Sequence, residues 1–268
     1  MIAAANDDFI LREPEDVYRA KARENLSSHQ LADFRKCPTL YHKKKLGLIE
    51  DVDRPAYIVG RAVHALALEG GRVFENRYAI GGPINPKTGS PFGANTKAYA
   101  EWAAAQGKPV LTDTQFELVT KLAGAVQAHE AAQRLLADGV PEGVVRGEYC
   151  GETCQVRMDW FSAERGIVDL KTCDDLTWFE SDARRYGYIH QMAFYRAVVR
   201  AISGETFPVH LIAAEKCEPF RCGVWRMGED VLGIAQKENE EAIARLKQCR
   251  KHDRWPTLYE EIRVFDWL

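Results

Sequence analysis

The spacing of apolar positions changes near residue 139 of this 268-residue chain. Upstream, the spacing has a helical period. Ser27 and Gln30 form a capping box that predicts the start of one helix, and residues 54–71 predict a second helix that ends at a glycine pair. Alanine-rich stretches at 95–106 and 113–138 predict further helices. Residues 1–26 are polar and predict a flexible arm, which leaves residues 27–268 as a single domain.

Downstream of residue 139 the pattern becomes that of short strands. The predicted strands are 144–150, 154–161 and 166–172, and glycine-containing turns join them into a meander. They are followed by a helix at 180–202, strands at 207–216 and 220–227, and a helix at 229–250. The predicted fold class is α/β (α+β), with a central mixed β-sheet in the order helix, three strands, helix, strand, surrounded by additional helices.

Charged side chains lie inside two of these strands, where burial is costly. Because side chains alternate along a strand, Arg157 and Asp159 are expected on one face, with Val156, Met158 and Trp160 on the other. Asp169 and Lys171 likewise share a face of the next strand. If the two strands pair, both carboxylates come to the same place in the sheet.

Two neighbouring carboxylates repel one another unless they share a proton or bind a cation. Oxygen ligands of this kind favour Mg²⁺ or Mn²⁺, and Lys171 adds a positive charge that could hold a phosphate or orient a water molecule. The simpler alternative is a surface hairpin with alternating polar residues and an Asp–Lys pair.

The same residues resemble a known signature. Asp159 followed by Asp169-Leu170-Lys171 is similar to the D-(x)n-(D/E)-x-K pattern of the PD-(D/E)xK nuclease superfamily, whose core has the order αβββαβ. The segment GRAVHALALEG resembles the preceding helix in the RecB/λ-exonuclease-like branch, and HQMAFYRAV resembles its Q-x-x-x-Y motif. The segment WPTLYEEI resembles the end of the RecE-type exonuclease VIII domain.

The resemblance implies roles for individual residues. Asp159, Asp169 and the Leu170 carbonyl would bind metal, Lys171 would position the attacking water, and His64 would bind or orient a second metal. Glu148 could be an additional acid on the first strand. The residues expected to contact DNA are Arg157, Arg184, Tyr188, Gln191, Tyr195, Lys43 and Lys44. Taken without the resemblance, a mid-helix histidine such as His64 is more often a hydrogen-bonded core residue, and Gln191 with Tyr195 could equally be a polar seam between helices.

Composition and charge restrict the possible functions only slightly. The net charge of −3 gives no sign of a broadly basic surface, although residues 29–54 contain a basic cluster. We expect a cytoplasmic protein without a membrane segment, because no apolar run is long enough to span a bilayer and the first residues are too acidic for a signal peptide. The spacing of the seven cysteines predicts structural thiols, and no iron–sulfur cluster built on Cys37, Cys217, Cys222 and Cys249 is expected.

The function that the resemblance implies is a Mg²⁺-dependent (or Mn²⁺-dependent) exonuclease acting on double-stranded DNA ends. We expect 5′→3′ polarity, a role in recombination or repair of the phage or prophage type, and a RecT-like single-strand annealing protein as a partner. A homo-oligomeric ring of three or four subunits is expected as well. The alternatives are a CRISPR-adaptation-type or other endonuclease of the superfamily, and a non-catalytic DNA-binding module.

Overall fold

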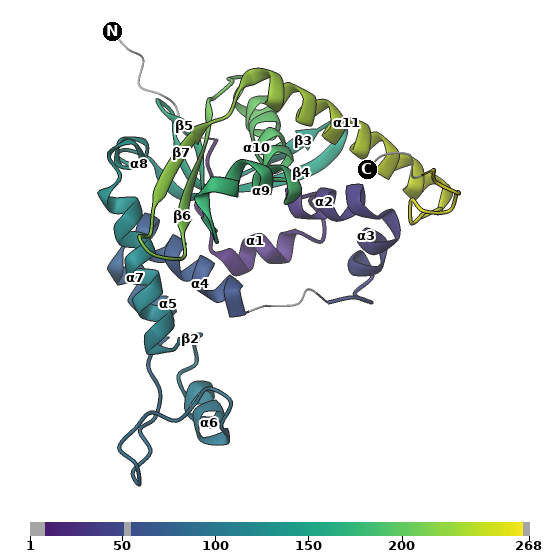
Figure 1. The fold of residues 1–268 in the computed structure, drawn as a ribbon. Coiled ribbons are helices and arrows are strands. Elements are labelled where there is room, and N and C mark those ends of the chain that lie inside the picture. Colours follow the sequence, from purple (N-terminus) through teal and green to yellow (C-terminus); the bar gives the residue numbers. More distant parts are fainter. Residues whose placement is uncertain (1–8, 51–54, 265–268) are drawn as a thin grey trace.

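The computed structural model describes residues 9–50 and 55–264. A five-stranded sheet lies between two groups of helices (Figure 1). The strands are β3 (Val140–Tyr149), β4 (Glu152–Ser162), β5 (Gly166–Cys173), β6 (Val209–Glu215) and β7 (Cys222–Arg226). They lie side by side in this order, and only β5 and β6 are parallel.

The longest helices lie on the two sides of this sheet. They are α4 (Pro55–His64), which continues into a π-helical turn at Ala65–Glu69, α7 (Asp113–Ala128), α10 (Tyr188–Ser203) and α11 (Glu229–His252). The shorter α-helices are α1 (Glu15–Lys21), α2 (Ser28–Lys36), α3 (Pro38–Lys45), α5 (Gly71–Arg77), α6 (Lys97–Ala105), α8 (Glu130–Leu135) and α9 (Phe179–Arg185). A 3₁₀ turn at Leu176–Trp178 leads into α9. The predicted α/β class, the mixed sheet and the αβββαβ order are confirmed.

The alternation of strand side chains builds two separate cores. Ile167 of β5 packs with Met192 and Phe194 of α10, whereas Val168 and Leu170 pack on the opposite face, where α4 and α7 lie. Trp160 was expected on the face of Val156 and Met158, and this prediction is wrong. It packs in the α4–α7 core, so the alternation of β4 changes phase beside Asp159.

The expected arm at 1–26 is not loose over residues 9–26, which are the part of it that the structure describes. Leu11 and Val144 exchange backbone hydrogen bonds of 2.7 and 3.0 Å, and Leu26 does the same with the β4 residues Thr153 and Gln155. Between these contacts α1 crosses the sheet, and the Gln155 side chain donates to the Tyr18 carbonyl. Non-local backbone pairing therefore holds a segment whose polar composition suggested an arm.

Two predicted helices are interrupted. The stretch 180–202 forms α9 and α10, because Gly187 adopts a left-handed conformation (φ 75°) that ends one helix and begins the other. The stretch 113–138 forms α7 and α8, separated at His129. The capping box of Ser27 and Gln30 is confirmed at the start of α2.

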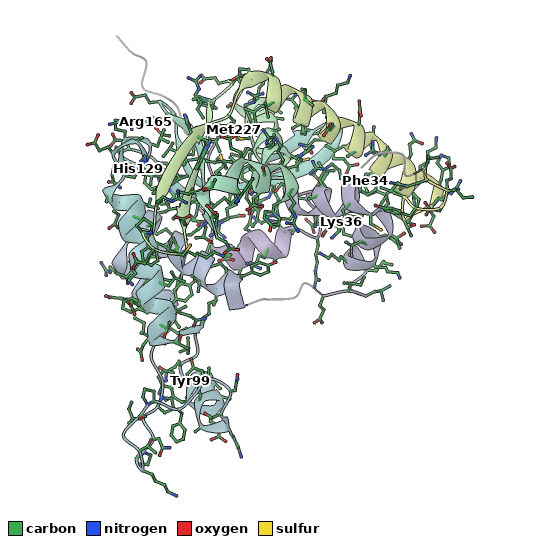
Figure 2. All side chains as sticks on the ribbon, in the orientation of Figure 1. Phe34, Lys36, Tyr99, His129, Arg165 and Met227 are labelled. Carbon is green, nitrogen blue, oxygen red and sulfur yellow. The ribbon has the colours of Figure 1, made fainter. Side chains whose placement is uncertain are left out.

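The glycine- and proline-rich segment 81–93 belongs to an extension that also carries α6 and projects from the body of the protein (Figure 1). Tyr99 lies on it, apart from the sheet (Figure 2). The short parallel strands β1 (Ala79–Ile80) and β2 (Val110–Leu111) pair at its base. Across residues 9–50 and 55–264, no helix combines the length and apolar character needed to cross a bilayer.

Gly166 sets how closely β5 approaches β6. Its backbone has φ +85°, and a Cβ atom there would lie 2.0 Å from the Pro208 carbonyl oxygen, which accepts the Ile167 N–H at 2.9 Å. We predict that Gly166→Ala lowers the free energy of unfolding by about 3 kcal/mol, since it adds backbone strain and a steric clash.

Urea unfolding of Gly166→Ala and, in parallel, of Gly204→Ala separates the steric clash from the backbone strain. Gly204 has a similar φ of +78°, but a Cβ there meets no atom within 4 Å. Gly204→Ala should therefore show the strain alone and lose less stability. Equal losses in the two variants would mean that the close approach of β5 to β6 is not what requires glycine at 166.

Candidate functional site

The site begins where β4 and β5 separate. The backbone pairing of β4 with β5 ends at Trp160 and Val168. At the next residue of β4, the Asp159 carboxylate accepts a hydrogen bond from β5 in place of a backbone carbonyl. Its Oδ2 accepts the Leu170 N–H at 2.7 Å. Because the N–H and C=O of one strand residue point to the same side, the Leu170 carbonyl also faces this gap. The gap thus collects two kinds of oxygen atom that can bind a cation.

Glu142 is the residue that sequence reasoning missed. The pairs Pro141–Trp160 and Gly143–Met158 place it opposite Asp159 on the neighbouring strand. Its backbone has φ 54°, in the left-handed region that a residue with a Cβ adopts at an energetic cost. Ligand atoms of Glu142, Asp159 and His64 all lie within 4.8 Å of one another, close enough for a single metal ion.

His64 reaches this group from the α4 face of the sheet. It is the last residue of α4, directly before the π-helical turn at Ala65–Glu69, and such turns often occur at functional sites. The neighbouring residues Ala62, Val63 and Ala65 are fully buried and anchor the helix. The His64 Nδ1 lies 3.4 Å from Asp159 Oδ2. The imidazole therefore lies beside a carboxylate of the site.

The electrostatics of Glu142 indicate a place for a cation. Burial, reinforced by the charge of Asp159, raises the pKa of Glu142 to about 8. Arg157 opposes this effect, because its Nε lies 2.7 Å from a Glu142 oxygen. Without a further positive charge, this environment disfavours the charged form of Glu142.

A second group of residues reaches the gap from the α10 side. Lys171 Nζ lies 2.5 Å from Asp169 Oδ2 and donates to Gln191 Oε1 at 3.1 Å. The Gln191 Nε2 donates to Asp169 Oδ1 at 3.3 Å and to the Tyr195 hydroxyl at 3.1 Å. Gln191 thereby fixes the relative positions of the lysine and the acid.

The environment of Asp169 disfavours its charge despite the lysine. Burial, together with the nearby Asp159, raises the pKa of Asp169 to about 6. Burial acts against the charged form of Lys171, but Asp169 and Asp159 outweigh it and raise the pKa of the lysine. Lys171 therefore stays protonated, and the site contains more acidic groups than its one ammonium can neutralise.

The residues expected to contact DNA have varied surroundings. Tyr188 lies beside the site, with its ring centroid 4.6 Å from Lys171 Nζ. Tyr195 is only 5% exposed and reaches the site through Gln191. Arg157, whose side chain is 13% exposed, is enclosed by Glu142 and Glu15 and does not face solvent as a DNA contact would.

The remaining predicted residues lie outside this cluster. Arg184 is exposed on α9 and does not share the helix of Gln191. Lys43 is exposed on α3, and Lys44 pairs with Asp33 at 2.8 Å. Glu148 is exposed and faces Thr153 near the β3–β4 turn, away from the group that Glu142 joins. Glu148 is thus replaced by Glu142 as the acid that β3 brings to the site.

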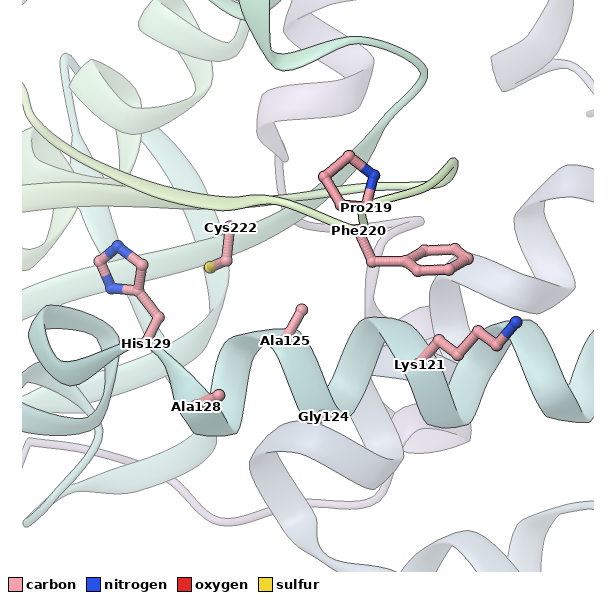
Figure 3. Close-up of a pocket in the computed structure, with 8 residues that line it drawn as sticks. All are labelled: Lys121, Gly124, Ala125, Ala128, His129, Pro219, Phe220 and Cys222. Carbon is pink, nitrogen blue, oxygen red and sulfur yellow. The ribbon is translucent and has the colours of Figure 1, made fainter.

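The seven cysteines are free thiols, and burial raises the pKa of Cys154 to about 12. The prediction about an iron–sulfur cluster stays a prediction. Away from the carboxylates, the surface is hollowed between α7 and the β6–β7 turn, where Lys121, Ala125, His129 and Phe220 line a depression (Figure 3). Its lining contains no carboxylate, so it is separate from the candidate site.

Comparisons with known proteins bear on the family and the fold of this chain. The family model described as "PDDEXK-like domain of unknown function (DUF3799)" matches residues 27–266. A candidate exonuclease from Eubacterium rectale is similar in fold, with a TM-score of 0.69 and 18% sequence identity over 96% of this chain and 96% of that chain. LHK-Exo in complex with dAMP matches with a TM-score of 0.32 and 12% identity over 90% of this chain and 98% of that chain, which is too low for a structural argument.

No curated protein matches the chain. The E. rectale likeness bears on the fold alone, because the identity is low. The family match, in contrast, spans nearly the whole sequence and includes every residue of the αβββαβ core. The chain therefore belongs to the PDDEXK-like domain family, within the PD-(D/E)xK superfamily that its sequence resembles.

Proposed function

We propose that this protein is a divalent-metal-dependent nuclease that hydrolyses phosphodiester bonds in DNA. One observation carries the proposal: the carboxylates of Glu142 and Asp159 face one another across two strands, with His64 within 4.8 Å. Like charges placed opposite one another in a sheet destabilise it. A fold that keeps such a pair beside a lysine–aspartate pair is suited to binding a cation and a phosphate.

The donor set fits Mg²⁺ or Mn²⁺. Glu142, Asp159 and His64 would hold the ion, with Asp169 and the Leu170 carbonyl as further oxygen donors. When bound, the metal supplies charge neutralisation on the phosphate and lowers the pKa of a coordinated water.

The chain's own residues supply the other parts of the reaction. The Lys171 ammonium, held between Asp169 and Gln191, can donate a hydrogen bond to the attacking water and stabilise negative charge as it develops on the phosphate. Gln191 prevents the lysine from turning away, because its amide contacts both members of the ion pair. Tyr188 covers one side of the ammonium and limits its access to solvent.

Finer properties follow from the sequence resemblance to RecE-type exonucleases and are proposals as well. They are action from duplex ends with 5′→3′ polarity, a role in phage-type recombination or repair, a single-strand annealing partner, a cytoplasmic location and a ring of three or four subunits. An endonuclease, including one of the CRISPR-adaptation type, would use the same site. A DNA-binding module without activity is disfavoured because Asp159, Asp169 and Lys171 are all present.

Linear duplexes with labelled ends, and closed circular duplexes of equal length, test the proposed function. Incubation with Mg²⁺ should degrade the linear duplex and leave the circle intact, and EDTA should stop the reaction. The order of label release from either strand gives the polarity. Cleavage of the circle would favour the endonuclease, and binding without cleavage in Mg²⁺ or Mn²⁺ would favour the inactive module.

Glu142→Gln should flatten the pH dependence of stability in the metal-free protein. Burial and Asp159 raise the pKa of Glu142 to about 8 in the folded chain, from an ordinary 4.5. The folded chain therefore binds more protons than the unfolded chain between these values, and its free energy of unfolding falls as the pH rises through them. Added Mg²⁺ should restore stability at the upper end, because the cation takes the place of the proton.

Urea unfolding in EDTA across this pH window measures the effect. In Glu142→Gln the free energy of unfolding should still fall with rising pH, but with a smaller slope, near the pKa of Asp169, which is about 6. Glu148→Gln, on the same strand but exposed, is the matched control and should behave like the parent. Equal slopes in the parent and both variants would show that Glu142 titrates normally.

Asp159→Asn should lower the cleavage rate by roughly 10³-fold or more, because the metal loses a charged ligand. The fold should be kept, since the asparagine oxygen can still accept the Leu170 N–H. Without metal, the melting temperature should hold or rise as the repulsion with Glu142 disappears. Asp169→Asn should lower the cleavage rate to a similar extent. Asp138→Asn, which changes an exposed acid, is the control and should keep the parental rate. Cleavage by Asp159→Asn at the parental rate would remove this site from consideration.

Lys171→Ala should slow cleavage by roughly 10²- to 10³-fold, the usual effect of removing one group that stabilises developing charge. Calorimetric titration with Mn²⁺ should give an affinity close to that of the parent. Lys216→Ala, which removes a lysine paired with Asp174 at 2.7 Å, is the control and should keep full activity. A parallel fall of metal affinity and rate would instead make Lys171 a structural partner of Asp169.

A further inference from the structure

A chain of cations and aromatic rings leads from the site to the surface at the junction of α9 and α10. The Lys171 ammonium lies 4.6 Å from the centroid of the Tyr188 ring. The centroids of the Tyr188 and Tyr186 rings are 5.9 Å apart, and the angle between the ring planes is 37°. The Arg185 guanidinium lies 5.5 Å from the centroid of Tyr186. These contacts are consecutive, and they lead outward from Lys171 to Tyr186 and Arg185.

The exposed fraction of these side chains increases from Tyr188 outward to Tyr186 and Arg185. Tyr188 is partly buried and packs against Phe179, whereas Tyr186 is 57% exposed and Arg185 is exposed. The left-handed turn at Gly187 separates the two tyrosines, so that Tyr186 caps the C-terminal end of α9 and Tyr188 begins α10. The Tyr186 ring is therefore accessible from solvent at the outer end of these contacts.

Positive charge surrounds these rings. Arg184 and Arg185 are exposed in the last turn of α9, and Arg35 of α2 approaches the backbone of Gly187. Several acids nearby already have partners: Asp174 pairs with Lys216, Asp175 with Arg221, and Glu180 accepts the Trp225 indole N–H. Asp182 is the remaining acid of α9 and is partly buried.

We propose that Tyr186 and Arg185 form a stacking platform for an unpaired nucleotide of the DNA strand next to the cleavage site. A base can stack on the Tyr186 ring, and the guanidinium can contact the phosphate that follows it. Every base has a π-face, so such a platform binds single strands with little sequence preference. This inference rests on the proposed nuclease function and specifies its substrate as a strand that is unpaired at the site.

Equilibrium binding of fluorescent oligo(dT) and of a blunt hairpin duplex, both in EDTA, tests the platform without cleavage. Tyr186→Ala should weaken oligo(dT) binding by roughly 5- to 100-fold, the range expected for the loss of one stacked base. The loss for the duplex should be smaller. Tyr186→Phe keeps the ring and should bind as the parent does.

The C-terminal segment offers a matched control. Tyr259 is 72% exposed and has the Arg263 guanidinium 4.1 Å from its ring centroid, but it lies beyond the end of α11. Tyr259→Ala removes the same kind of exposed Tyr–Arg pair and should leave oligo(dT) binding unchanged. Thermal melting of each variant should match the parent, because neither ring is buried.

Several results would overturn the platform. They are unchanged binding by Tyr186→Ala, an equal loss in Tyr186→Phe or Tyr259→Ala, or no affinity of the parent for either probe. A change of oligomeric state in Tyr186→Ala, seen by light scattering, would assign the ring to a protein interface. If the parent cleaves DNA but Tyr186 has no effect, only the platform fails. If Tyr186 governs binding but Mg²⁺ gives no cleavage, only the nuclease function fails.

Discussion

The repulsion between two carboxylates on neighbouring strands is the constraint on which the site depends. Glu142 and Asp159 are held opposite one another because the backbone pairing of β3 with β4 continues on both sides of them. Asp159 is fixed further by the Leu170 N–H, and Arg157 offsets part of the charge on Glu142. The fold thus stores an unfavourable charge arrangement that a cation relieves.

The three-layer architecture brings the rest of the site to this pair. His64 comes from the α4 layer on one face, and Gln191 comes from the α10 layer on the other. Both reach the sheet at the point where β4 and β5 separate. Lys171 and Asp169 lie on the strand that borders this gap. The carboxylate pair and the lysine-containing part of the site therefore need the whole core.

Local patterns predicted the elements that local forces determine. Alternation predicted that Asp169 and Lys171 share a face of their strand, and their side chains lie 2.5 Å apart. Glu142 was missed because Pro141 and Gly143 flank it and read as a turn, so that the strand was expected to begin at Val144.

The other differences have non-local causes. Residues 9–26 are held by backbone bonds to β3 and β4, which no local pattern of the segment reveals. The face of Trp160 depends on a change of phase beside the carboxylate pair, which a simple alternation rule does not contain. These differences cluster around Glu142 and Asp159, as expected if the site departs from regular strand geometry in order to place its charges.

Anomalous diffraction from crystals of the full chain soaked in Mn²⁺ tests the central claim most directly. We expect a peak in contact with the carboxylates of Glu142 and Asp159 and the imidazole of His64, and no such peak in crystals of Glu142→Gln soaked in the same way. A peak elsewhere, or none at this position in the parent, would contradict the claim that the opposed carboxylates are maintained to bind a metal ion.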